Sequence, residues 1–322
     1  MSRAATAALV RERSPDPWHG WVRFAPARWP GPAEPWIDLA EGCLGKNDGE
    51  PDVLTALAAL QLDGVLYVPP VATGLSDARD RLVAQQTARG TPVVAQLVAC
   101  EEPTPALAAE GVTIVWDLLG AALDGRESSA VFPGAKPGRG SAVLWPLLSG
   151  LGDDVRVARL ADVAATAGVG ALQAVPVELS GRERRELGET LDEARYLQLF
   201  HGEPPAATVV ARAAARRGLA PILGRPLPRP PLRGAANLRL AGLLAECGEL
   251  CLLAGETESR AHALLRAARF AERGEHDLVA LAREGNLGVI PWLEAEARDL
   301  VVEAAAGGEP RLRRELIARL AA

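Results

Sequence analysis

The chain has 322 residues, of which 48% are hydrophobic, and this is enough to bury one large core and a small second domain. Its formal net charge of −6 argues against a protein that neutralises nucleic-acid phosphates along one basic face. The four cysteines are too few and too scattered for a disulfide framework, and no apolar run is long enough to span a membrane. We therefore expect a cytoplasmic protein without membrane contact.

Residues 1–34 contain several prolines and three tryptophans without a steady period, which predicts an irregular arm whose indoles pack on the body. From residue 36 onward, short apolar segments alternate with segments of helical periodicity. The predicted strands are 36–43, 64–68, 92–99, 112–118, 142–148, 171–179, 196–201 and 220–224. The predicted helices are 52–61, 77–88, 104–109, 155–168, 181–192 and 206–217. Residues 125–140, rich in Gly, Ser and Pro, predict a long loop.

This alternation predicts an α/β fold over residues 35–225, as a (β/α)₈ barrel or a partial TIM-like barrel. A doubly wound open sheet is the alternative. Neither a Gly-x-Gly-x-x-Gly after the first strand nor a Walker motif marks a nucleotide site. Residues 226–236 predict a proline-rich linker, and residues 237–322 a small all-α domain.

The carboxyl ends of the predicted strands carry the candidate catalytic residues, because these ends meet on one face of such a barrel. Asp117, Glu178 and His201 are the candidates for acid–base or metal chemistry, and Arg225 could bind an anion. Polar strand ends are equally typical of a rim without activity. No spacing fixes a metal site, and the sequence leaves the cofactor unknown.

Three glutamines interrupt the apolar strands, namely Gln96, Gln173 and Gln198. A buried amide without partners costs about 1–3 kcal/mol, so these side chains must be hydrogen-bonded. They either form an internal polar layer or line a pocket for a ligand.

The segment Leu-Trp-Pro-Leu-Leu-Ser-Gly-Leu-Gly-Asp-Asp at 144–154, with the helix and strand after it, resembles radical SAM proteins. That resemblance extends over about residues 35–225. The family holds a 4Fe–4S cluster on a Cys-x₃-Cys-x₂-Cys motif after the first strand. Here Cys43 stands in place, but Asn47 and Glu50 follow it, and one thiolate cannot hold the cluster. The resemblance therefore implies a barrel that has lost its cofactor chemistry.

A second resemblance covers residues 237–316. The run Gly255-Glu256, then Arg260-Ala, then Arg266-Ala-Ala-Arg269, resembles the small amino-terminal domain of X-family DNA polymerases, which contains a helix-hairpin-helix. This family's hairpin reads Pro-Gly-hydrophobic-Gly, and its backbone N–H groups hold a DNA phosphate.

The residues that give this family its chemistry are replaced here. The hairpin segment reads Pro291-Trp-Leu-Glu294, so an indole and a carboxylate stand where the two glycines belong, and the carboxylate repels a phosphate. The lysine that forms a Schiff base in lyase members aligns with Leu300, and the chain has lysines only at 46 and 136. The resemblance therefore excludes lyase chemistry in this domain.

These two losses favour a non-catalytic protein. In this interpretation a degenerate barrel and a helical domain form an interaction or scaffold module, in contact with a partner protein or with itself, beside nucleic-acid metabolism such as DNA repair. One alternative is an enzyme that uses Asp117, Glu178 and His201 at the barrel rim. The other is a weak nucleic-acid binder, a disfavoured role, that uses Arg260, Arg266 and Arg269.

Overall fold

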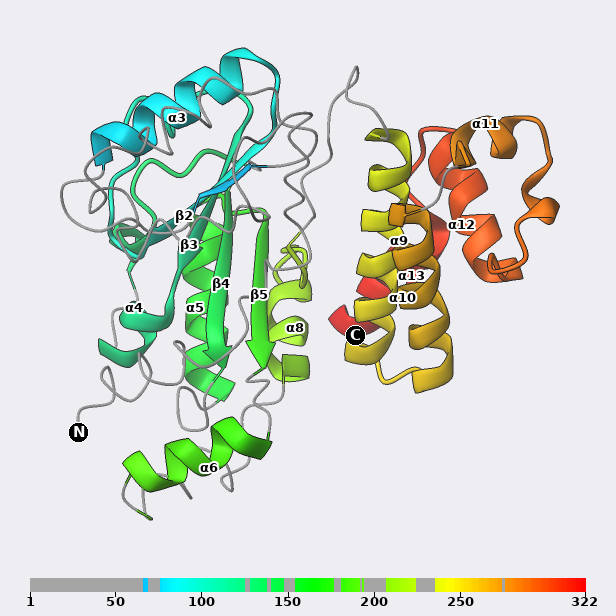
Figure 1. Ribbon diagram of the computed structural model, residues 1–322. Coiled ribbons are helices and arrows are strands. Elements are labelled where there is room, and N and C mark those ends of the chain that lie inside the picture. Colours follow the sequence, from blue (N-terminus) through cyan, green and yellow to red (C-terminus); the bar gives the residue numbers. More distant parts are fainter. Residues whose placement is uncertain are drawn as a thin grey trace.

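The protein comprises an α/β unit followed by an all-helical unit (Figure 1). The computed structural model describes residues 66–68, 76–124, 128–137, 140–147, 154–176, 181–191, 193, 207–223, 235–273 and 276–322. The predicted arm, the predicted strands 36–43 and 196–201 and the predicted helix 52–61 lie outside these residues. No helix in the described ranges combines the length and the apolar character that a membrane crossing requires.

Five parallel strands form one sheet, which confirms the predicted α/β class. They are β1 (Leu66–Val68), β2 (Val93–Val98), β3 (Val112–Asp117), β4 (Gly140–Leu147) and β5 (Ala171–Pro176). Their order in the sheet is their order in the chain, and every neighbouring pair is parallel. A single bridge from Ala171 to Ala220 continues the series beyond β5.

The helices of the α/β unit contribute their apolar residues to one face of this sheet. They are α3 (Ser76–Ala88), α4 (Leu119–Asp124), α5 (Asp154–Thr166), α6 (Gly181–Thr190) and α8 (Ala207–Ala215). Because side chains alternate along a strand, Ala95 and Leu97 join this helix-covered core, whereas Val94 joins a separate cluster on the other face with Val115 and Val143. Burial on both faces explains why these strands read as continuous apolar runs.

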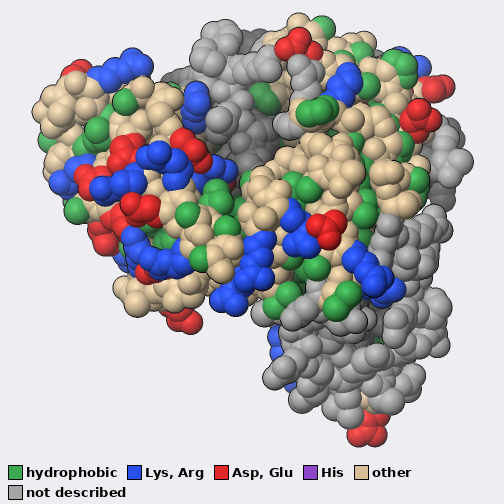
Figure 2. All heavy atoms as spheres, turned by 180° about the vertical axis from the view of Figure 1, so that it is seen from behind, with side chains coloured by type: hydrophobic (Ala, Val, Ile, Leu, Met, Phe, Trp, Pro, Cys, Tyr) green, Lys and Arg blue, Asp and Glu red, His purple; other side chains and the backbone are tan. Residues whose placement is uncertain are grey.

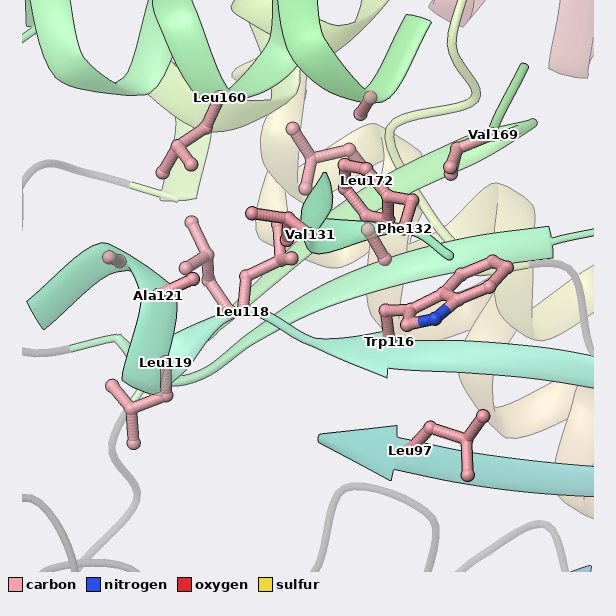
Figure 3. Close-up of a cluster of buried hydrophobic side chains, with 14 of the residues drawn as sticks. Leu97, Trp116, Leu118, Leu119, Ala121, Val131, Phe132, Leu160, Val169 and Leu172 are labelled. Atoms are coloured by element: carbon pink, nitrogen blue, oxygen red, sulfur yellow. The ribbon is translucent and has the colours of Figure 1, made fainter. Parts of the chain in front are cut away.

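Trp116 is the largest side chain of the helix-covered core and is 1% exposed. Its ring meets the Phe132 ring edge-on, with centroids 5.6 Å apart, and Leu172 belongs to the same cluster (Figure 3). Gly140 on β4 leaves room for the indole, since a Cβ there would lie 2.9 Å from the Trp116 Cη2 atom. The close approach of strand and ring therefore requires glycine at 140.

Three local expectations differ from the structure. Residues 105–108 form a turn in place of the predicted helix 104–109, and Gly111, whose φ is 95°, prevents its continuation as a helix. The predicted loop 125–140 contains a 3₁₀ turn, Ser129–Val131, and the short helix α4 precedes it. The predicted strand 220–224 is reduced, in its described residues, to the bridge at Ala220.

The helical unit consists of α9 (Ala235–Leu253), α10 (Glu258–Arg273), α11 (Leu278–Arg283), a 3₁₀ turn at Leu287–Val289, α12 (Ala295–Ala305) and α13 (Arg311–Ala321). Helices α9 and α10 lie side by side (Figure 1). Gly248 permits this close packing, since a Cβ there would lie 2.8 Å from Leu265 Cγ.

Helix α8 joins the two units. Its residues Val210 and Ala214 belong to the sheet core, whereas Ala211 and Ala215 belong to the core of the helical unit. Helix α13 contacts α8, so the end of the chain packs against the α/β unit. The small alanine side chains let these helices approach closely.

Candidate functional site

Asp117, a candidate catalytic residue, ends β3 on the sheet face that lacks described helices. Its side chain is buried, at 2% exposure. The Gln96 Nε2 group donates to its Oδ2 at 3.1 Å, and the Leu119 backbone N–H donates to its Oδ1 at 3.0 Å. Both carboxylate oxygens therefore accept hydrogen bonds from the protein, and the second bond caps the first turn of α4. A buried carboxylate requires such partners whether or not it takes part in catalysis.

A second carboxylate, at the carboxyl end of a neighbouring strand, is held in the same way. Glu101 follows β2, where its Oε1 accepts from the guanidinium of Arg79 at 3.2 Å and its Oε2 accepts from the backbone N–H of Val98 at 3.2 Å. Arg79 lies in the first turn of α3 and is 2% exposed, so a buried charge is neutralised here. This pair ties the start of α3 to the end of β2, and sequence analysis gave no signal for Arg79.

Cys100 directly precedes Glu101 in the chain and is exposed. It is the one non-glycine residue with positive φ, at 71°, among the residues that the structure describes. Its backbone N–H donates to the Val131 carbonyl at 3.0 Å, which holds the turn in this left-handed conformation.

The structure describes only some of the other candidate residues at the strand ends. Glu178, His201 and Arg225 lie outside the described residues, as does Gln198. Gln173 accepts from the Leu223 backbone N–H at 3.0 Å and so fastens the segment beyond β5 to the sheet. Within the described ranges, no three His, Cys, Asp or Glu side chains gather into a group that could hold a metal ion.

In the helical unit, the segment 291–294 leads into α12, and Trp292 and Glu294 contact α10. Trp292 stacks on Phe270 with ring centroids 5.4 Å apart and an interplanar angle of 25°. Glu294 is the N-cap residue of α12, and its carboxylate pairs with the Arg266 guanidinium at 2.9 Å. The segment therefore places a negative charge at the positive end of the α12 dipole.

The three arginines proposed to bind nucleic acid differ in their surroundings. Arg260 binds Glu296 through several hydrogen bonds, one of 2.9 Å from its Nε, and it also pairs with Glu256 at 2.9 Å. The hydrogen bond to Glu296 raises the pKa of Arg260. Arg266 is paired with Glu294, as described above. Arg269 is exposed and has no ion-pair partner among the described residues.

Charges of both signs cover the helical unit. On the face that Figure 2 shows, Arg side chains alternate with Asp and Glu over this unit, at the left of the view. The ion pair between Arg313 and Glu246, at 2.8 Å, links α13 to α9, and Arg319 pairs with Glu256. This mixing matches the even distribution of Arg and Glu in the sequence.

Leu300 and the two cysteines of the helical unit are buried. Leu300 on α12 is 2% exposed and belongs to the core. Cys247 and Cys251 are fully buried, and loss of solvent raises the pKa of both thiols. Protonated thiols in an apolar core are poor nucleophiles, so these two cysteines serve packing.

The chain matches no known protein family, no curated protein and no solved structure. The function must therefore be inferred from the geometry of the site residues.

Proposed function

We propose that this protein is a non-catalytic interaction module, built from a degenerate barrel and a modified helix-hairpin-helix domain. The observation that carries the proposal is the hairpin at 291–294. A ring stack and an ion pair occupy the two positions through which a phosphate would approach the backbone.

For the α/β unit, we propose a partial TIM-like barrel. Five strands that are parallel and adjacent in chain order suit a barrel, because a doubly wound sheet reverses its strand order at a switch point. The described helices of the α/β unit all pack on one face of the sheet. This supports the same fold, since a doubly wound sheet carries helices on both faces. In this barrel, Val94, Val115 and Val143 face the interior.

A non-catalytic role accounts for the hydrogen bonds of the described rim carboxylates. In both Asp117 and Glu101, the two carboxylate oxygens accept hydrogen bonds from protein donors. These donors include the backbone N–H groups of Leu119 and Val98. Groups engaged in this way hold loops in place. The same account applies to Arg260, whose guanidinium is engaged by two carboxylates.

Binding of gapped and single-stranded DNA tests the proposal directly. We expect no change in fluorescence anisotropy with the full chain at micromolar concentration and low salt, where phosphate contacts are strongest. The double variant Trp292→Gly/Glu294→Gly restores a Gly-x-Gly hairpin, and we expect it to gain weak, salt-sensitive binding. The interpretation of the hairpin would be overturned if the wild-type chain bound DNA and if Glu294→Gly left that binding unchanged.

A further inference from the structure

The C-terminal helix α13 packs against both units of the protein. It contacts α9 of the helical unit and α8 of the α/β unit, and it contacts α8 more extensively than α9 does (Figure 1). Leu316 and Leu320 of α13 are each 2% exposed, and they share a core cluster with Ala211 and Ala215 of α8. Among the described elements of the helical unit, α13 therefore makes the most extensive contact with the α/β unit.

Two ion pairs join α13 to the rest of the helical unit. The Arg313 Nε group donates to Glu246 Oε1 on α9 at 2.8 Å, and the Glu246 side chain is only 7% exposed. A second pair joins Arg319 to Glu256, in the turn between α9 and α10. When α13 leaves α9, the buried carboxylate of Glu246 loses this counter-charge, which is strongly unfavourable.

Helix α13 is too short to be stable by itself. It has 11 residues, and an isolated helix of that length is marginal in water. Its formation therefore depends on the surfaces of α8 and α9, which belong to different units. A helix that forms only when both surfaces are in place links the stability of one unit to that of the other.

We propose that α13 is a clamp that fixes the relative position of the two units and makes them unfold together, with the Arg313–Glu246 pair as its fastening. Each unit keeps a core of its own when α13 detaches. The sheet core contains no residue of α13, and the helical core is built mainly from α9, α10 and α12. Release of α13 thus lets the units change their relative position without unfolding either of them. This role is independent of what either unit binds.

Differential scanning calorimetry of the full chain tests the coupling. We expect the wild type to unfold in a single transition whose calorimetric and van't Hoff enthalpies agree. Arg313→Met leaves Glu246 buried without its counter-charge, and we expect its unfolding to split into two transitions. Arg314→Met is the matched control and should keep the single transition, because Arg314 is exposed and has no ion-pair partner among the described residues.

Hydrogen exchange of the same variants reports on α13 directly. In Arg313→Met, the amides of α13 should exchange about a hundredfold faster than in the wild type, as the loss of one partner from a buried pair predicts. A smaller increase in α10 distinguishes detachment of α13 from a general loss of stability. If Arg313→Met does not fold, Arg313→Lys gives the same comparison with an increase of about tenfold, because lysine keeps the charge but lacks the planar fork.

A double variant separates the clamp from the charge itself. Glu246→Leu/Arg313→Met removes both buried charges, so α13 should dock again and the single transition should return. Two transitions in the wild type would overturn the coupling. The clamp is equally wrong if Arg313→Met unfolds in one transition while its α13 amides exchange a hundredfold faster, since the units then stay coupled without α13. Wild-type exchange of α13 in both Arg313 variants would contradict the role of the ion pair.

Discussion

Substitution of Asp117 separates a structural role of this carboxylate from a catalytic one. Asp117→Ala removes the acceptors of the Gln96 amide and the Leu119 backbone N–H, two donors on residues that are only 3% and 5% exposed. Each hydrogen bond lost to this buried carboxylate costs about 1–3 kcal/mol, and relief from burying the carboxylate offsets part of the sum. We therefore expect a loss of about 2–4 kcal/mol in the free energy of unfolding.

Two further variants define the cause of that loss. Asp117→Asn keeps an acceptor for the Leu119 N–H, and the Gln96 amide can turn to present its oxygen, so we expect a loss of only about 1 kcal/mol. Glu102→Ala changes an exposed carboxylate of the same rim and should leave stability at the wild-type value.

Urea unfolding followed by tryptophan fluorescence measures all three variants. Removal of a catalytic carboxylate commonly leaves a protein equally stable or more stable. An Asp117→Ala protein as stable as the wild type would therefore refute the structural role and favour an enzyme with its site at this rim.

Three other predictions concern packing, thiol reactivity and pH. Gly140→Ala should destabilise the protein by about 1–3 kcal/mol in thermal unfolding, because the Trp116 ring fills the space of the new methyl group. Gly120→Ala, which meets no atom within 4 Å, should instead stabilise it by about 0.5–1 kcal/mol, and equal effects at both glycines would contradict the packing argument. In the native protein, an aromatic disulfide reagent should modify the exposed Cys100 rapidly and leave Cys247 unmodified until urea is added, because burial raises the pKa of the Cys247 thiol. The hydrogen bond from Arg217 lowers the pKa of Asp162, so this pair stabilises the fold above the ordinary carboxyl pKa near 3.8 and the contribution disappears as pH falls through the lowered pKa. In Asp162→Asn, the urea midpoint should accordingly depend less on pH below about 3.8 than it does in the wild type. An unchanged pH dependence in this range would contradict a stabilising role of the Arg217–Asp162 pair.

The strands and helices that the structure describes were largely predictable from local pattern. The apolar segments at 93–98 and 112–117 are mostly buried, and their alternation with helical segments indicated the strands of an α/β fold. Helices α3, α5, α6 and α8 begin and end within a few residues of the predicted bounds. Their periodicity is a property of the chain over a few turns, and it does not depend on what lies across the fold.

The sequence by itself also determined that residues 291–294 contain no glycine and that residue 300 is a leucine. Only the tertiary structure decided which side chains the charged residues contact. The partners Gln96 and Asp117 are 21 residues apart, Arg266 and Glu294 are 28 apart, and Arg260 and Glu296 are 36 apart. Each pair joins two elements whose mutual position follows from packing of the whole core, and no local pattern encodes that position. A sequence does not distinguish a charged residue that is paired within the protein from one that can bind a ligand. That distinction depends on which side chains the fold places beside it.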